Sequence, residues 1–319
     1  MTAIRADAHE QIYIGGSHTL EPFAQYVSQE FSKGTTYPSP VYKSIGSEAA
    51  LDMFIKGDEV TRIDIAMLSR QIEFPEFSQA KVEEVNDIIQ MPVGLDGIVL
   101  AGAREGAKFR LTRKDLFLAL AAEVPLRGKL EKNPYKTWNQ IRPDLPKQKI
   151  LVYGPPGSSG TRHVFVEKVI GEQSRTMPEY LDYAGKYLKL RRDGAYVAIV
   201  DHDEALLDEV RNNKDAIGII SYGLYMQNRD AVRYATIDGF APTYDNIESG
   251  KYPISRTLFM CVHGSNIEKV KGIRTYIELF LSEEMIGDNG QLCDLGLIPL
   301  SSAERLRNRI DWLKRSSQF

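Results

Sequence analysis

Apolar residues follow two alternating patterns along this chain. Short apolar runs, which predict β-strands, are followed by stretches with an apolar residue every three or four positions, which predict amphipathic helices. The strand-like runs are residues 11–14, 41–44, 63–67, 88–101, 149–153 and 216–221, with a further strand within 252–263. The helix-like stretches are residues 21–31, 48–56, 116–122, 161–170 and 267–282. This alternation predicts an α/β fold.

The length and composition are those of an ordinary globular protein. The chain has 319 residues, of which 43% are hydrophobic and 26% charged, so we expect two domains or one large α/β unit. No flexible linker is visible, so two domains would be joined by strands, for which residues 88–101 and 256–262 are the candidates. The net charge of −3 argues against nucleic-acid binding through bulk charge.

Metal, disulfide and membrane signals are weak. The five histidines are scattered without metal-ligand spacing, so we expect no metal and no cofactor. Cys261 and Cys293 allow at most one disulfide, and the sequence leaves open whether it forms. No stretch reaches the roughly 18 uncharged apolar residues of a membrane span. The N-terminus lacks the apolar core of a signal peptide, so the protein is either cytosolic or has lost its signal.

Three predicted strand-to-helix junctions combine glycine with hydroxyl side chains. They are residues 15–20, 45–49 and 157–162. The first backbone N–H groups of a helix lack internal partners, and the helix dipole adds positive potential, so each junction could hold an anion. Arg162 in the first turn of the third helix opposes that dipole, which favours an anion facing it.

The same residues also fit ordinary helix capping, because Ser and Thr are preferred N-caps. No junction matches the phosphate loop GxxxxGK[ST] or the dinucleotide pattern GxGxxG. Nucleotide binding at these junctions is therefore disfavoured.

Ordered motifs over nearly the whole chain resemble the phosphate-binding proteins of phosphate-specific ABC importers, in particular alphaproteobacterial members. The motifs are GSHTLEPF (16–23), IGS (45–47), DIAMLSR (64–70), GLDGIVLA (94–101), NPYKTW (133–138), SGTR (159–162), RDGAY (192–196), AIGI (216–219), SGKYPISR (249–256) and GLIPL (296–300).

The resemblance implies a two-lobed periplasmic-binding-protein fold of type II. Each lobe would be a mixed sheet flanked by helices, and two crossover strands would join them. Lobe 1 would hold residues 1–97 and 257–319 and lobe 2 residues 98–256, with the ligand cleft between them. It further implies a non-enzymatic periplasmic protein, with its signal peptide absent here, that delivers inorganic phosphate to membrane permease subunits. The acidic net charge and the two-lobe shape suggest a monomer.

The resemblance also assigns phosphate-binding residues. It places the Thr19 hydroxyl and the N–H groups of Thr19 and Leu20 on phosphate, together with Ser47, Ser159, Gly160 and Thr161. The acidic residue that some members carry after the third strand is absent from Leu68-Ser69-Arg70, and Pro155 stands where some members have arginine.

Two inferences about charge complete the assignment. We expect Ser69 to bind phosphate, and Arg162, with Arg70, to supply positive charge. We expect Asp96 to accept the proton of HPO₄²⁻, which would repel sulfate. Alternatively, Arg70 is a surface salt-bridge partner and Asp96 a cap or hinge residue, while Arg256 is expected to be structural.

His18 and His163 lie within the mapped loops. They are either exposed at the rim of the cleft or raise affinity when protonated below about pH 6.5. Three other functions stay open. One is a phosphatase using His163 beside Ser159 and Thr161. The others are a phosphate sensor and a binder of another oxyanion such as arsenate or sulfate.

Overall fold

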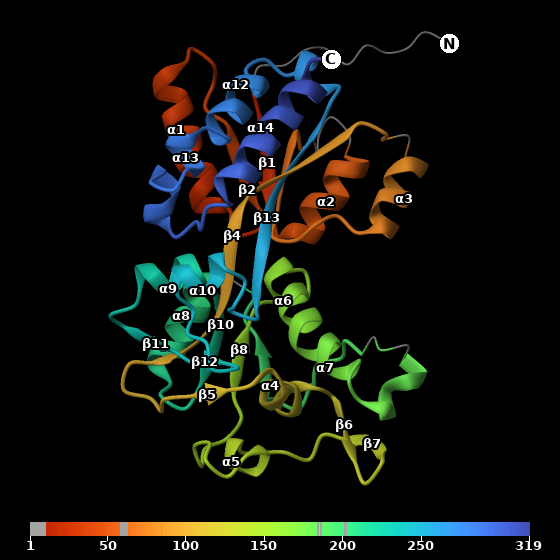
Figure 1. Cartoon of the computed structure of the whole chain (residues 1–319), viewed down its shortest axis with the longest axis vertical. Coiled ribbons are helices and arrows are strands. Elements are labelled where there is room, and N and C mark those ends of the chain that lie inside the picture. Colours follow the sequence, from red (N-terminus) through yellow and green to blue (C-terminus); the bar gives the residue numbers. More distant parts are fainter. Residues whose placement is uncertain (1–10, 58–62, 84, 184, 186, 201–202) are drawn as a thin grey trace. The chain divides into compact units, whose positions relative to one another are not determined.

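The computed structural model describes residues 11–57, 63–83, 85–183, 185, 187–200 and 203–319. The chain divides into two compact units, unit 1 (Met1–Leu95 and Thr257–Phe319) and unit 2 (Asp96–Arg256). The chain passes from one unit to the other within strands β4 (Ile88–Ala103) and β13 (Ser255–His263) (Figure 1). The first boundary, between Leu95 and Asp96, lies two residues before the one expected at 97/98. The second boundary lies between Arg256 and Thr257.

Unit 1 contains a mixed sheet in the order β2-β1-β3-β13-β4. Strand β1 (Tyr13–Gly16) runs parallel to β2 (Val41–Ser44) and β3 (Ile65–Leu68), whereas β13 is antiparallel to β3. Parallel neighbours require a crossover, which helices α1 (Glu21–Gly34) and α2 (Ser47–Lys56) provide. The carboxyl ends of β1, β2 and β3 therefore meet at one edge of the sheet.

Helices cover both faces of this sheet. Alternate residues of β3 enter different cores, because successive side chains of a strand point to opposite faces. Ile65 and Met67 pack with α1 and α12 (Ile273–Phe280), while Ala66 and Leu68 pack with α2 (Figure 1). The other helices of the unit are α3 (Phe74–Val82), α11 (Asn266–Lys269), α13 (Glu283–Ile286), the 3₁₀ helix Gln291–Leu295 and α14 (Ser302–Ser316).

Unit 2 is built on a second mixed arrangement of strands, β4-β10-β8-β9, with β11 also paired to β4. Strand β10 (Ile217–Ser221) is antiparallel to β4 and parallel to β8 (Val152–Gly154), and β9 (Tyr196–Ala198) is parallel to β8. The α/β class with mixed sheets is thus confirmed.

Shorter elements complete unit 2. The strands are β5 (Arg110–Leu111), β6 (Glu123–Leu126), β7 (Lys129–Lys132), β11 (Val232–Tyr234) and β12 (Thr236–Ile237). The helices are α4 (Arg113–Leu120), α5 (Trp138–Ile141), α6 (Gly160–Phe165), the π-helix Val166–Gly171, α7 (Glu172–Ser174), the 3₁₀ helix Pro178–Tyr183, α8 (Asp203–Asn212), α9 (Tyr222–Gln227) and α10 (Tyr244–Glu248).

The single helix expected over 267–282 is wrong. It is divided into α11 and α12 at Gly272, whose φ of 81° is left-handed and incompatible with a continuous right-handed helix. A Cβ at Gly272 would lie 2.8 Å from the Tyr37 ring, so packing also requires glycine. The apolar periodicity survives the break because Ile267 and Ile273 still enter the same core.

Both cysteines are free, which answers the question that the sequence left open. Cys261 is buried and Cys293 is partly buried. In the described part of the chain, no helix is long and apolar enough to cross a membrane, and no cluster of His, Cys, Asp and Glu could hold a metal ion. His9 and His202 lie outside the described residues.

Candidate functional site

The N-terminus of α2 brings together two serines from different strand ends. Ser47 is the first residue of α2 and follows Gly46, which adopts a φ of 81°. The Ser47 Oγ lies 3.1 Å from the Ser69 Oγ and accepts a 3.2 Å hydrogen bond from the Ser69 N–H. Both serines are buried, and α2 has no side-chain cap. The first turn of α2 and these hydroxyls therefore form a set of donors suited to an oxyanion.

The loop after β1 uses much of its own hydrogen-bonding capacity. The Thr19 N–H donates to Ser17 Oγ at 3.3 Å, and the Leu20 N–H donates to the Ser17 carbonyl at 3.0 Å. The turn already uses both donors, so the expectation that the N–H groups of Thr19 and Leu20 bind phosphate stays a prediction. A Cβ at Gly16 would lie 2.3 Å from the Met67 carbonyl oxygen, so glycine is required for β1 and β3 to approach.

Arg70 does not supply a free positive charge. Its Nε and Nη2 donate to Glu48 at 3.1 and 2.7 Å, and its Nη1 and Nη2 donate to Glu76 at 2.8 and 2.6 Å. Its Nη1 also donates to the Gln71 carbonyl at 2.9 Å, which uses the fifth N–H.

The contacts of Arg70 bear on both expectations for it, a cation that faces the anion and a surface salt-bridge partner. Burial alone would lower the pKa of Arg70, but hydrogen bonds to Glu76 and Glu48 outweigh burial and raise it. Two carboxylates neutralise the guanidinium, so these contacts do not support the role predicted for Arg70 on an anion, which stays a prediction. Arg70 is an ion-pair partner, and a buried rather than a surface one.

In unit 2, the loop after β8 ends in the N-cap of α6. The Ser159 Oγ accepts a 3.2 Å hydrogen bond from the Thr161 N–H, and both side chains are buried. Gly160 is the first residue of α6, which continues without interruption into the π-helix. The structure thus places Ser159, Gly160 and Thr161 together at one helix N-terminus, as the spacing predicts.

Arg162 is the cation of this second group. Its guanidinium carbon lies 4.9 Å from the centroid of the Tyr196 ring, and the Tyr196 hydroxyl donates to the Pro155 carbonyl at 2.6 Å. Burial raises the pKa of Tyr196 to about 12, although Arg162 opposes that rise. Within the described ranges, no carboxylate pairs with Arg162, so its charge stays available to an anion.

Asp96 is one partner of a buried ion pair. Its Oδ2 accepts hydrogen bonds from Arg256 Nε and Nη2 at 2.9 and 2.7 Å, and its Oδ1 accepts from the Tyr222 N–H at 3.0 Å. The two charged side chains are only 3% and 2% exposed. Burial raises the pKa of Asp96, and the Arg256 guanidinium opposes this rise.

These contacts do not support the prediction that Asp96 takes the proton of phosphate, which stays a prediction. The carboxylate caps the start of α9 and neutralises Arg256, which corresponds to the alternative of a cap or hinge residue. Arg256 has the structural role expected of it.

The two histidines are partly buried rather than fully exposed. The His18 Nδ1 lies 2.6 Å from the Ser44 Oγ, and His163 is a residue of α6. Their effect on anion affinity stays a prediction.

Several relevant contacts had no signal in the sequence. No sequence motif links Arg162 to Tyr196, on whose ring it stacks. Nor does a motif link Arg70 to Glu76, which neutralises it. The spacing Glu73-x-x-Glu76 at the start of α3 was the one visible hint, because it forms a capping box that positions the Glu76 carboxylate.

The fold of each unit, with hydroxyl residues at a helix N-terminus after a strand, is that of a solute-binding protein. The family model of the PBP superfamily domain matches residues 2–284. The chain therefore belongs to the PBP superfamily.

Individual relatives and structures are consistent with this family. The chain is 23% identical over 276 residues to the phosphate-binding protein PstS of Staphylococcus haemolyticus, covering 84% of this chain and 76% of the relative. It is 23% identical to the protein SphX of Synechocystis over 91% of this chain and 79% of the relative.

A similar solved structure is a putative phosphate ABC transporter substrate-binding protein with bound phosphate from Clostridium perfringens. Its TM-score is 0.67 at 21% identity, with 91% of this chain and all of that chain covered. An ABC-type phosphate transport receptor from Vibrio cholerae has a TM-score of 0.63 at 21% identity, with 90% and 99% covered. At these identities the likeness shows the fold.

Proposed function

We propose that this protein captures inorganic phosphate and delivers it to the permease subunits of an ABC importer. The observation that carries the proposal is the Ser47–Ser69 pair at the N-terminus of α2, which has no side-chain cap and presents buried hydroxyls. The relatives named as phosphate-binding and the similar structure with bound phosphate support the choice of ligand.

The proposal gives each group a distinct task. In unit 1, the hydroxyls of Thr19, Ser47 and Ser69 and the first N–H groups of α2 bind phosphate oxygens. In unit 2, the N-terminus of α6 does the same with Ser159, Gly160 and Thr161. Arg162 supplies the positive charge, because Arg70 is already neutralised. The protein acts by binding rather than by catalysis.

A second candidate is a less selective oxyanion binder. Asp96, the acceptor expected to reject sulfate, is occupied by Arg256 and the Tyr222 N–H. Hydroxyl groups can both donate and accept, so the Ser47 and Ser69 pair could accept the proton of HPO₄²⁻, but less strictly than a carboxylate. Arsenate, and to a lesser degree sulfate, would then compete with phosphate.

Isothermal titration calorimetry tests both candidates. The protein is denatured, dialysed and refolded to remove carried-over ligand, then titrated with phosphate, arsenate and sulfate. We expect one phosphate ion per chain with micromolar or tighter affinity, weakened at least tenfold in Thr161→Val and in Ser69→Ala. Equal affinity for sulfate would favour the oxyanion binder, and no binding by refolded protein would refute both candidates.

The cellular setting belongs to the same proposal. A binding protein that serves an importer acts outside the cytoplasmic membrane, so we infer export to the periplasm and a monomer that contacts permease subunits. Growth of a deletion strain on limiting phosphate, with and without the gene in trans, tests the transport role. Normal growth and normal phosphate uptake in the deletion strain would contradict it.

A further inference from the structure

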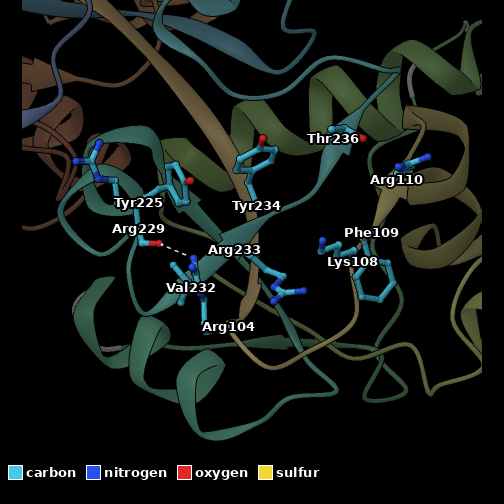
Figure 2. Close-up of a pocket in the computed structure, with 10 residues that line it drawn as sticks. All are labelled: Arg104, Lys108, Phe109, Arg110, Tyr225, Arg229, Val232, Arg233, Tyr234 and Thr236. Carbon is cyan, nitrogen blue, oxygen red and sulfur yellow. Dashed lines mark hydrogen bonds between the residues drawn. The ribbon is translucent and has the colours of Figure 1, made fainter.

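Unit 2 contains a group of cations apart from Arg162, but these side chains do not converge on one point. They line a pocket of about 400 Å³ where β4 ends, which no carboxylate lines: Arg104, Lys108, Arg110, Arg229 and Arg233. Figure 2 shows Arg233 and Tyr234, consecutive residues of β11, pointing to opposite sides, and the Arg229 guanidinium pointing away from both. Arg162, in contrast, is held in one place by an aromatic ring.

Tyr196 provides that ring. The guanidinium carbon of Arg162 lies 4.9 Å from the centroid of the Tyr196 ring. A guanidinium that stacks on a ring uses its flat face for the contact, so the N–H groups along its edge are still able to donate to an anion. The stacking therefore restricts the Arg162 side chain without neutralising its charge.

The Tyr196 ring is itself fixed against the end of β8. Tyr196 lies on β9, where it pairs with Val152 of β8, and it is only 8% exposed. Its hydroxyl donates to the Pro155 carbonyl at 2.6 Å. A Cβ at Gly154 would lie 2.5 Å from the Tyr196 hydroxyl oxygen and 2.6 Å from the ring, so a glycine at this position leaves the ring the space it occupies. The ring thus lies at the start of the loop that leads to α6.

The helix that carries Arg162 directs its side chain toward the same loop. Arg162 is the third residue of α6, and the side chains of a helix point back toward its N-terminus. The helix continues through the π-helix and α7 from Gly160 to Ser174. Ser159 caps its start by accepting the Thr161 N–H. The stacked guanidinium therefore belongs to the helix N-terminus at which the hydroxyl groups of unit 2 gather.

We propose that Tyr196 is a positioning residue for phosphate binding, which holds the Arg162 guanidinium at the N-terminus of α6 while leaving the edge of the guanidinium free for the anion. This inference rests on the proposed function. Tyr196 does not bind the anion through its own hydroxyl, which the Pro155 carbonyl already occupies. An arginine that is already ordered loses less conformational entropy when the anion binds, so the ring raises affinity by preorganisation.

A double-mutant cycle on phosphate affinity tests the proposal. Calorimetry is performed on the ligand-free wild type, Tyr196→Leu, Arg162→Gln and the double variant, each below its melting transition. Arg162→Gln should weaken phosphate binding at least tenfold, because a charge-assisted hydrogen bond is lost. Tyr196→Leu should weaken it at least fivefold in the wild-type background. In the Arg162→Gln background, the same substitution should change affinity less than twofold, because no guanidinium remains to be positioned.

Two further substitutions separate the ring from the rest of the residue. Tyr196→Phe keeps the ring and should bind phosphate within about threefold of the wild type. Gly154→Ala displaces the ring but changes neither Tyr196 nor Arg162, so it repeats the test if Tyr196→Leu fails to fold. It should weaken binding in the wild-type background and leave binding in the Arg162→Gln background unchanged.

Tyr180 supplies the matched control. It is buried in unit 2, and its hydroxyl also donates to a backbone carbonyl at 2.6 Å, that of Glu123. Tyr180→Leu should lower Tm but leave phosphate affinity unchanged. Raising the salt concentration should weaken phosphate binding more in the wild type than in Tyr196→Leu, because the charge of Arg162 is then less well placed.

Four results would overturn the proposal. They are an equal loss from Tyr196→Leu in both backgrounds, no loss from Tyr196→Leu or Gly154→Ala, an equal loss in Tyr180→Leu, and wild-type affinity in Arg162→Gln. The first would show that Tyr196 acts through packing alone. If the wild type binds phosphate, any of these results refutes this inference and leaves the proposed function in place. If the folded wild type binds no phosphate, both fail.

Discussion

The Asp96–Arg256 ion pair should govern the stability of unit 2 and not the choice of anion. Asp96→Asn keeps the shape of the side chain but removes the carboxylate charge that faces the Arg256 guanidinium, which is only 2% exposed. Breaking a buried pair by removing one partner costs about 3–5 kcal/mol. Each kcal/mol shifts Tm by about 2–4 °C in a domain of 150–250 residues, so Tm should fall by about 6–20 °C.

Thermal and urea unfolding of four proteins measure this effect. They are the wild type, Asp96→Asn, Arg256→Met and the double variant. The double variant should be more stable than the sum of the two single losses predicts, because neither charge is then left unpaired in the interior. Calorimetry below the melting transition should give a phosphate-to-sulfate affinity ratio within about twofold of the wild type.

One result would refute this reasoning. If Asp96→Asn melts within 2 °C of the wild type and gains sulfate binding, then Asp96 acts as the anion selector and its contact with Arg256 is incidental. A destabilised variant with unchanged selectivity supports the structural role. The two readouts are independent, so a folding defect cannot imitate a change in selectivity.

Three further outcomes follow from local geometry. Ser47→Ala should weaken phosphate binding about tenfold or more, since a hydrogen bond to a charged group contributes about 1.5–3 kcal/mol; unchanged affinity in calorimetry would remove Ser47 from the site. Hydrogen bonds from His263 and Ser265 hold the pKa of the Asp87 carboxyl well below its usual value, so its stabilisation is present above about pH 4 and is lost as pH falls further. Asp87→Asn should therefore lower Tm by a few degrees at pH 7 and by progressively less as pH falls below about pH 4, and a loss that does not diminish as the solution is acidified would contradict the linkage. A thiol reagent should label Cys293 in the native protein and reach buried Cys261 only on unfolding; mass spectrometry showing two labels under native conditions would disprove this.

Local features of the fold could be predicted because local sequence determines them. The strand at Val41–Ser44 lies where the apolar run predicts it, and α4 begins after Thr112, whose side chain caps it. The hydroxyl residues Ser47 and Ser159 stand at helix N-termini because the preference of serine for that position acts over a few residues.

The partners of charged groups could not be predicted in the same way. Asp96 and Arg256 are 160 residues apart, and nothing in either neighbourhood identifies the other. The sequence around Arg70 did not indicate an ion pair, because the two carboxylates that neutralise Arg70 come from other elements, α2 and α3. The residues that flank a charged side chain in the sequence do not reveal whether that side chain forms an ion pair in the fold.

The sequence by itself determined the α/β class, most element positions and the helix starts at which hydroxyl groups gather. The tertiary structure alone decided which charges remain available. In the folded protein, Arg70 and Asp96 form ion pairs, whereas Arg162 stacks on Tyr196. Several cationic side chains lie near the end of β4 in a pocket that no carboxylate lines. The physical reason is range: propensity and capping act over a few residues, whereas charge compensation depends on which side chains the completed fold brings within hydrogen-bonding distance.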